Sequence, residues 1–406
     1  MRHQTRLTRI STIVLALYFC AGCGNKAPSF SSREEVQQAA RMAVHHLVGR
    51  STKSGMFIYC TNLNPEVVVA PGYNILRHAG TIYAMAMYNG TYPDERVQSA
   101  MLEAGRYLQK EALFPVPGSG NLFAIWSRPE VNKTGTPLQA KLGGTGLGLV
   151  SLLSIEAVQP GFMPMDQLRG MGRFVLYMQK PEGNFHSKYI PATGGLDDQW
   201  ESLFYPGEAA LGLAMLYEKD PDPLWLEGAL KALTFLAHNR RDAQSVPEDH
   251  WALLATERLF LFQKPLITDE LGQLLLGHAD QICRSMLTRY EKGRKPGNRQ
   301  GRILQDLSVT QVSCTLEGLL AALSIFPQNH VLRPRLENTA KEGVTFLLGT
   351  QISQGDEKGA FPRNDLASHS MGCGQGRIDP RNAELRIDYT QHALSALVRY
   401  LKLGEE

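Results

Sequence analysis

Three carboxylates stand where acid–base chemistry could be done in this sequence of 406 residues. Glu208, Asp249 and Asp388 each lie at the start of a segment that reads as a helix. A carboxyl buried at such a position must be paired or have a raised pKa, and a raised pKa is what a general acid needs. We expect these three residues to be catalytic. The alternative is that each only caps its helix or complements the helix dipole.

Further polar and aromatic side chains occur at the same helix starts and are candidates for substrate binding. An arginine there can clamp a carboxylate or phosphate, and aromatic rings suit stacking against sugars. Each also has an ordinary explanation as an ion pair, a structural histidine or a packing residue. The expected binding residues are Arg77, His78, Tyr205, His250, Trp251, Glu317 and His392.

Helical patterns that would position these residues recur along most of the chain. A Ser32–Glu35 capping box predicts a first helix that runs to about residue 47. Two short segments, 57–59 and 67–69, look extended. The remaining predicted helices span 75–89, 94–111, 143–157, 164–179, 205–219, 223–238, 249–262, 268–289, 309–325, 332–351 and 388–403.

These twelve or so helices are of two alternating kinds. One kind is amphipathic, as in 226–239, and the other is apolar or small throughout its body, as in 146–153. A helix that is apolar all round is buried, whereas an amphipathic one faces solvent on one side. The alternation predicts an all-α fold, an (α/α)6 double-ring barrel formed by residues 33–406 as a single domain. The inner helices would be parallel, so their polar starts would gather on one face.

A weak internal repeat supports the same architecture. Its two copies are Gln179-Gly183-Phe185 and Gln351-Gly359-Phe361. The repeat resembles the Gln-x-x-x-Gly-x-Trp repeat of terpenoid-cyclase and prenyltransferase α/α toroids, with Phe in place of Trp and a longer gap in the second copy. A glutamine can cap the end of a helix while the aromatic ring packs beneath the following turn.

The resemblance to prenyltransferases implies a zinc site that this sequence does not complete. Those enzymes hold zinc with an Asp, a Cys two residues later and a His on the last inner helix. His392 and Cys314 are similar to the last two, but Val312 stands where the Asp belongs. The Asp-x-Asp-Asp motif of terpenoid cyclases is also incomplete, since Leu196-Asp197-Asp198 lacks its first Asp. We therefore expect no metal and no other cofactor.

The N-terminal segment predicts export. Basic residues precede an apolar run from residue 10 to 20, and Cys20-Ala21-Gly22-Cys23 follows. This segment resembles a bacterial lipoprotein signal, although Cys20 replaces the usual aliphatic residue. The resemblance implies a signal peptide over 1–22, a lipidated Cys23, a tether over 23–32 and attachment to the cell envelope. An ordinary cleaved secretory signal is the alternative.

Composition and cysteine content limit the remaining possibilities. A net charge of +3 argues against a nucleic-acid partner, and 43% hydrophobic residues suit a globular protein with a large core. Export would permit disulfides. Four cysteines follow the N-terminal segment, but their spacing assigns no pairing; they are Cys60, Cys283, Cys314 and Cys373.

The body as a whole resembles the six-hairpin (α/α)6 class, many members of which are glycoside hydrolases, polysaccharide lyases or sugar epimerases. We expect an envelope-anchored carbohydrate-active enzyme of the hydrolase or lyase type, acting on a glycan or another envelope polymer. One alternative is a non-catalytic toroid that binds an envelope polymer or a partner protein; it would have each acid neutralised and no open pocket. A second is an isoprenoid cyclase or prenyltransferase.

Overall fold

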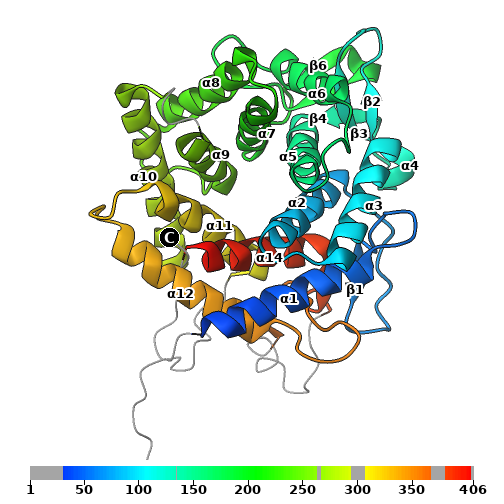
Figure 1. Ribbon diagram of the computed structural model, residues 1–406, viewed down its shortest axis with the longest axis vertical. Helices are drawn as coiled ribbons and strands as arrows, with labels where there is room; N and C mark the ends of the chain where they lie inside the picture. The colour runs from blue at the N-terminus through cyan, green and yellow to red at the C-terminus, as the bar shows by residue number, and fades with distance from the viewer. Residues whose placement is uncertain (1–30, 134, 263–266, 294–306, 367–379, 404–406) are drawn as a thin grey trace, which may run out of the picture.

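Twelve long helices form two concentric rings in the computed structural model, which describes residues 31–133, 135–262, 267–293, 307–366 and 380–403 (Figure 1). The inner ring comprises α2 (Ile75–Thr91), α5 (Leu142–Val158), α7 (Tyr205–Lys219), α9 (His250–Phe262), α11 (Val309–Ile325) and α14 (Ile387–Lys402). The outer ring comprises α1 (Arg33–Arg50), α3 (Glu95–Glu111), α6 (Met165–Tyr177), α8 (Pro223–Arg240), α10 (Asp269–Lys292) and α12 (Arg333–Thr350). Each inner helix packs against the next, and α14 packs against α2, so the inner ring closes. The predicted (α/α)6 barrel is confirmed.

The inner helices approach one another closely because small residues line their contacts. In α5 the backbone at Gly146 lies against α7, and a Cβ there would sit 2.8 Å from the carbonyl oxygen of Glu208. Gly212 of α7 packs on the same turn of α5, where a Cβ would lie 2.9 Å from the carbonyl oxygen of Gly146. These contacts hold the first turns of α5 and α7 together, and Glu208 lies in the first turn of α7.

The outer helices bury one side and are capped by the residues that their sequences supply. Ser32 and Glu35 form the predicted capping box at the start of α1. Asp94 accepts hydrogen bonds from two backbone N–H groups of α3, and Thr268 accepts one from α10. Such caps satisfy N–H groups that have no partner within the helix.

The internal repeat has the structural role that its composition indicates. Gln179 Nε2 donates to the carbonyl oxygens of Gly183 and Gly228, while Gln351 Nε2 donates to those of Gly359 and Ala39. In each copy the glutamine therefore ties the end of one outer helix to the next outer helix. The aromatic residues of both copies, Phe185 and Phe361, are buried.

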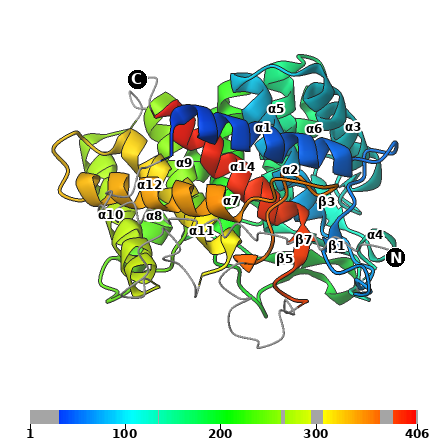
Figure 2. The same cartoon turned by 90° about the horizontal axis from the view of Figure 1, so that it is seen from below.

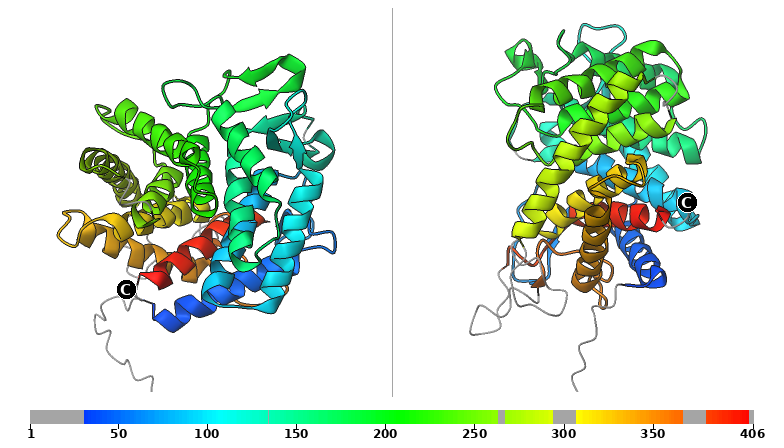
Figure 3. Two further views of the ribbon diagram at one scale, coloured as in Figure 1. Left: turned by 45° about the horizontal axis from the view of Figure 1, so that its top comes forward. Right: turned by 90° about the vertical axis from the view of Figure 1, so that its left-hand side faces the viewer.

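Short strands occupy the connections between helices. The first pair joins β1 (Cys60–Asn62) to β7 (Glu384–Arg386) in antiparallel register beside the start of α14 (Figure 2). A second sheet packs against α5 and α6 on one side of the double ring (Figure 3). Its strand order is β2 (Leu113–Pro115), β3 (Phe123–Ser127), β4 (Gln139–Lys141), β5 (Lys188–Ile190) and β6 (Gly195–Asp197). A short helix, α4 (Pro129–Asn132), and a 3-10 turn, η1 (Pro191–Thr193), complete these connections.

The two segments predicted to be extended are only partly so. Phe57 forms an isolated bridge with Ser51, and the strand β1 begins after the predicted segment. Residues 67–69 form no strand. A strand of three residues is too short to show a hydrophobic pattern in the sequence. The partner of β1 also lies more than 300 residues away, so no hairpin signal marks it.

The described residues include three of the four cysteines and only the last part of the predicted tether. The expected signal peptide, Cys23 and most of the tether lie outside the described residues. Within the described ranges, no helix combines the length and the apolar character needed to cross a membrane. Cys60, Cys283 and Cys314 are free thiols, and Cys373 lies outside the described residues.

Candidate functional site

The first turns of the inner helices line a cavity of about 680 Å³. Helices α2, α7, α9, α11 and α14 all contribute side chains to it, so the predicted gathering of helix starts on one face is present. Of the residues expected at the site, six line this cavity: Arg77, Glu208, His250, Trp251, Asp388 and His392. Four do not: His78, Tyr205, Asp249 and Glu317.

Glu208 presents a buried carboxyl at the wall of the cavity. Its side chain belongs to the first turn of α7, the residue is only 5% exposed, and Oε2 has no hydrogen-bond partner among the described residues. Burial and the nearby charge of Asp249 raise its pKa well above the usual range, and positive charge on His392 offsets only part of this effect. Burial therefore favours the protonated form of the Glu208 carboxyl, which is the form able to donate a proton.

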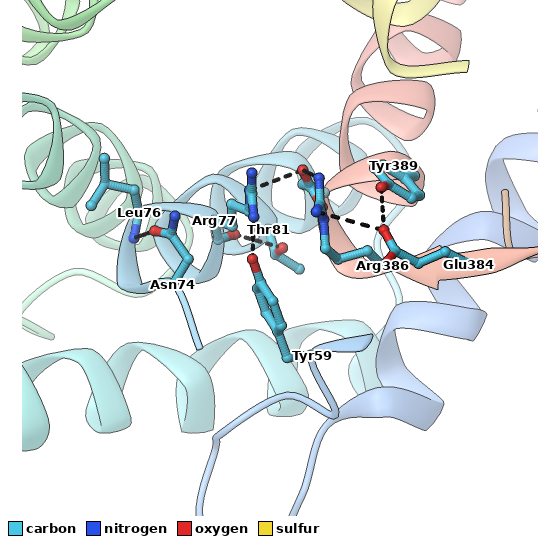
Figure 4. A network of polar contacts seen from close by, with 9 residues as sticks. Tyr59, Asn74, Leu76, Arg77, Thr81, Glu384, Arg386 and Tyr389 are labelled. Atoms are coloured by element: carbon cyan, nitrogen blue, oxygen red, sulfur yellow. Dashed lines mark hydrogen bonds and ion pairs between the residues drawn. The ribbon is translucent and has the colours of Figure 1, made fainter. Parts of the chain in front are cut away.

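Asp388 lies in the same cavity but is held by two arginines. Arg386 donates from Nε and Nη2 to the two carboxylate oxygens at 2.6 and 3.0 Å, and Arg77 Nε lies 3.0 Å from Oδ2. Arg77 also donates to the hydroxyl of Tyr59, which fixes it between α14 and the loop before β1 (Figure 4). Both carboxylate oxygens of Asp388 are therefore engaged by arginine side chains, which differs from the free catalytic carboxyl expected from the sequence.

Asp249 faces away from the cavity, which differs from the role expected for it. Its side chain is fully buried, where it accepts a hydrogen bond from the N–H of Ala252 and another from Arg240 Nη2, at 3.1 and 3.0 Å. Burial raises the pKa of Asp249 despite the charge of Arg240. The residue thus caps α9 and joins it to α8. Asp249 still affects the cavity, because its negative charge helps to raise the pKa of Glu208.

His78 and Tyr205 are packing residues in this structure. The two ring nitrogens of His78 are hydrogen-bonded to the hydroxyl of Tyr73 and the carbonyl oxygen of Ala104, at 2.7 and 2.9 Å. Burial lowers the pKa of His78 to about 4, so the ring is neutral and joins α2 to α3. Tyr205 packs edge-on against Trp200 beside the cavity wall.

A cluster of four polar side chains lies at the floor of the cavity. Cys314 and Glu317 are one turn apart on α11, while His250 begins α9 and His392 lies in the second turn of α14. His392 Nδ1 donates to Glu317 Oε2 at 2.8 Å, and His250 Nε2 lies 3.8 Å from the same oxygen. One nitrogen, sulfur or oxygen atom from each of the four residues lies within 4.8 Å of the corresponding atoms of the others. These donor types could hold a metal ion.

The charges within this cluster support one another. Burial disfavours the thiolate of Cys314, but positive charge on His392 and His250 outweighs it and lowers the pKa of the thiol to about 7. Burial likewise opposes the charge of His392, yet Cys314 and Glu317 raise its pKa well above the usual range. The sequence signal for this cluster is the Cys314-x-x-Glu317 spacing, which puts both side chains on one helix face. The prenyltransferase pattern does not include this spacing, because it places the acidic ligand two residues before the cysteine, where this chain has Val312.

The fold of this chain is similar to solved structures of six-hairpin, α/α-toroid enzymes that act on sugars. A sugar epimerase from a ruminal bacterium has a TM-score of 0.65 at 11% identity, covering 92% of this chain and 99% of the other. A cellobiose 2-epimerase from Spirochaeta thermophila has a TM-score of 0.60 at 14% identity, with coverage of 92% and 97%.

An unsaturated glucuronyl hydrolase specific for heparin also has a TM-score of 0.60, at 11% identity and with coverage of 92% and 99%. No family model matches the chain, and no curated protein sequence does. At these identities the likenesses show the α/α toroid and leave the chemistry to the residues of the cavity.

Proposed function

We propose that this protein is a carbohydrate-active enzyme whose reaction takes place in the 680 Å³ cavity, with Glu208 as the proton donor. One observation carries the proposal: a buried carboxyl with a raised pKa and without a hydrogen-bond partner on one oxygen lies at the cavity wall. In a glycoside hydrolase or lyase, such an acid protonates the departing glycosidic oxygen.

Other lining residues suit the binding of a sugar. Phe204 and Trp251 flank His250 and offer aromatic surface, and sugars commonly pack against such rings. Arg77 of α2 and Asp388 of α14 offer a charged donor and a charged acceptor to the hydroxyl groups of a sugar. An adjoining cavity of about 1140 Å³ shares Phe204, His250 and Cys314 with the first, which gives room for a polymer to extend beyond one residue.

The non-catalytic alternative is less well supported. It requires every acid to be neutralised by an arginine or a cap and the face of the barrel to be closed. Asp388 and Asp249 meet the first condition, but Glu208 does not, and the cavity contradicts the second. The similar folds of enzymes acting on sugars favour the same conclusion.

The test is a screen of the purified full-length chain against envelope polysaccharides and their oligosaccharides, with new reducing ends and unsaturated products as readouts. We expect Glu208→Gln to lower kcat by about 10²–10⁴-fold, the usual contribution of a general acid. Glu156→Gln is the matched control, because Glu156 is another buried glutamate, about 20 Å along the barrel axis near the far end of α5. Full activity in Glu208→Gln would overturn the proposal.

A second candidate function is isomerisation or epimerisation of a sugar without cleavage. The observation that favours it is the His250–His392 pair, whose ring centroids lie 5.7 Å apart at the cavity. Two imidazoles so placed can remove a proton from a carbon and return one to it. Exchange of a sugar C–H for deuterium in D2O, with no new reducing ends, would identify this reaction in the same screen.

We further propose that the chain is attached to the bacterial cell envelope through a lipid on Cys23. The support is the Cys20-Ala21-Gly22-Cys23 sequence after a basic and apolar segment. Cys23→Ser should abolish partition into the membrane fraction, while the parent chain should be released only by detergent. Continued membrane association of the variant would count against a lipid anchor.

A further inference from the structure

We propose that His250, Cys314, Glu317 and His392 together bind one Zn²⁺ ion at the floor of the cavity. The inference goes beyond the proposed function and does not rest on it, because ion binding can be measured without a substrate. It also revises the expectation of no metal, which considered only the position of Val312.

The donor set and its spacing fit this ion. Imidazole nitrogen, thiolate sulfur and carboxylate oxygen are the ligands that zinc takes in proteins, most often four in a tetrahedron. Donors of a tetrahedral zinc site lie about 3.3–3.8 Å apart, given bond lengths of about 2.0–2.3 Å. The four donors here lie within 4.8 Å of one another, so side-chain adjustments of roughly 1 Å would close them around one ion.

His250 is the feature that the protein alone does not explain. The residue is 2% exposed, and neither ring nitrogen has a hydrogen bond of normal geometry among the described residues; the groups that face the ring are Cys314 and Glu317 of the same cluster. Leaving buried polar atoms unpaired costs free energy, and native structures rarely do so without a reason. A bound ion would take the lone pair that points into the cluster.

The surroundings of the cluster support a metal in two further ways. Cys314 and Glu317 lie one turn apart on α11, so two of the four donors reach the cluster from the same face of one helix. Glu317 Oε2 lies 2.8 Å from His392 Nδ1 and 3.8 Å from His250 Nε2, so one carboxylate oxygen already faces both imidazoles. The four residues come from α9, α11 and α14, so the ion would cross-link three inner helices.

The ion would be reachable from the cavity, because His250, Cys314 and His392 all line it. A sugar oxygen could then approach the metal. The site also bears on the choice between the two candidate reactions. Zinc would occupy the lone pairs that proton transfer by His250 and His392 requires, so stoichiometric binding favours Glu208 as the proton donor.

The experiment titrates the metal-free full-length chain, in detergent, with Zn²⁺ and separately with Co²⁺ as a spectroscopic probe. We expect one ion per chain. The Co²⁺ form should show the visible bands of a tetrahedral ion and a thiolate-to-cobalt charge-transfer band. One equivalent of Zn²⁺ should displace Co²⁺ and should protect Cys314 from alkylation by iodoacetamide, as read from the modified peptide.

Variants separate this site from adventitious binding. Cys314→Ser should remove the charge-transfer band, and His250→Ala should weaken Zn²⁺ binding by about 100-fold or more, beyond the ~10–100-fold typical of losing an outer partner. Cys283→Ala, which removes a buried thiol of α10, should change neither. Circular dichroism of each variant distinguishes loss of the site from loss of the fold.

Three results would overturn the proposal: binding of less than one ion per chain, a six-coordinate cobalt spectrum without a thiolate band, or a spectrum that Cys314→Ser leaves unchanged. None of them would affect the proposed function, which depends on Glu208 and is measured by sugar turnover. Conversely, loss of activity in Glu208→Gln says nothing about the ion.

Discussion

The raised pKa of Glu208 has a measurable effect on stability. Since the folded chain holds this proton more tightly than the unfolded chain, the unfolded state binds fewer protons at pH values between the two pKa values. The free energy of unfolding therefore falls as pH rises above the unfolded pKa of about 4.3, by up to about 1.4 kcal/mol per pH unit, until the folded pKa is passed. Glu208→Gln has no such proton. Relative to the variant, the parent chain should lose stability progressively above about pH 5.

The assay is denaturant unfolding followed by far-UV circular dichroism at intervals from about pH 5 to about pH 8, with a chelator present. Glu156→Gln provides a control whose difference in stability from the parent chain should stay constant over this range. Backbone N–H groups of Met163 and Gly161 and the ammonium of Lys219 overcome burial and lower the pKa of Glu156. Its contribution to stability is therefore complete above its unfolded pKa and is lost as pH falls through its folded pKa.

The comparison depends on the slope rather than on the absolute stability of either variant, because glutamine introduces its own unpaired amide. If the difference between the parent chain and Glu208→Gln is constant from about pH 5 to about pH 8, the folded pKa of Glu208 is not raised and the assignment of a protonated acid is wrong.

Two further predictions concern close contacts between neighbouring elements of the double ring. Arg240→Met should lower the free energy of unfolding by about 3–5 kcal/mol, because it leaves the buried charge of Asp249 unpaired, and adding Asp249→Asn should restore most of the loss; no restoration would refute an electrostatic cause. Gly359→Ala should cost about 2–5 kcal/mol, since a Cβ at this φ of +92° would lie 2.1 Å from the carbonyl oxygen of Met42. Gly349→Ala in α12, which meets nothing within 4 Å, should instead gain up to about 1 kcal/mol in denaturant unfolding; equal effects of the two changes would contradict the close approach.

The helices and the face that carries the cavity could be predicted from the sequence because the information is local. Apolar runs such as 209–216 and 319–323 indicate buried helices, and α7 and α11 begin and end at the predicted residues. Parallel inner helices then place their polar starts together. The direction in which each side chain points could not be predicted in the same way. Asp249 and Glu208 occupy similar sequence positions, and the difference between them is Arg240, which α8 brings to one and not to the other.

The floor of the cavity shows the same limit. His250 and His392 were singled out separately as binding residues, but nothing local places a histidine of α9 beside one of α14. Their contact with Cys314 and Glu317 follows from the closure of the ring, which brings together residues up to 142 positions apart (392 − 250). Only the pair within one turn of α11 could have been recognised from its spacing.

Helix α1 packs against α12 and α14, so the first helix of the barrel depends on the last part of the chain. Gln351 donates to the carbonyl oxygen of Ala39, and Gly359 lies on that of Met42. During synthesis, α1 emerges about 300 residues before these partners, and contacts between such distant segments form slowly. A chain still being made must therefore leave the side of α1 that packs on α12 and α14 uncovered until those two helices have been synthesised. Truncation after residue 350 would remove α14 and the segment around Gly359, and would leave an inner ring that cannot close.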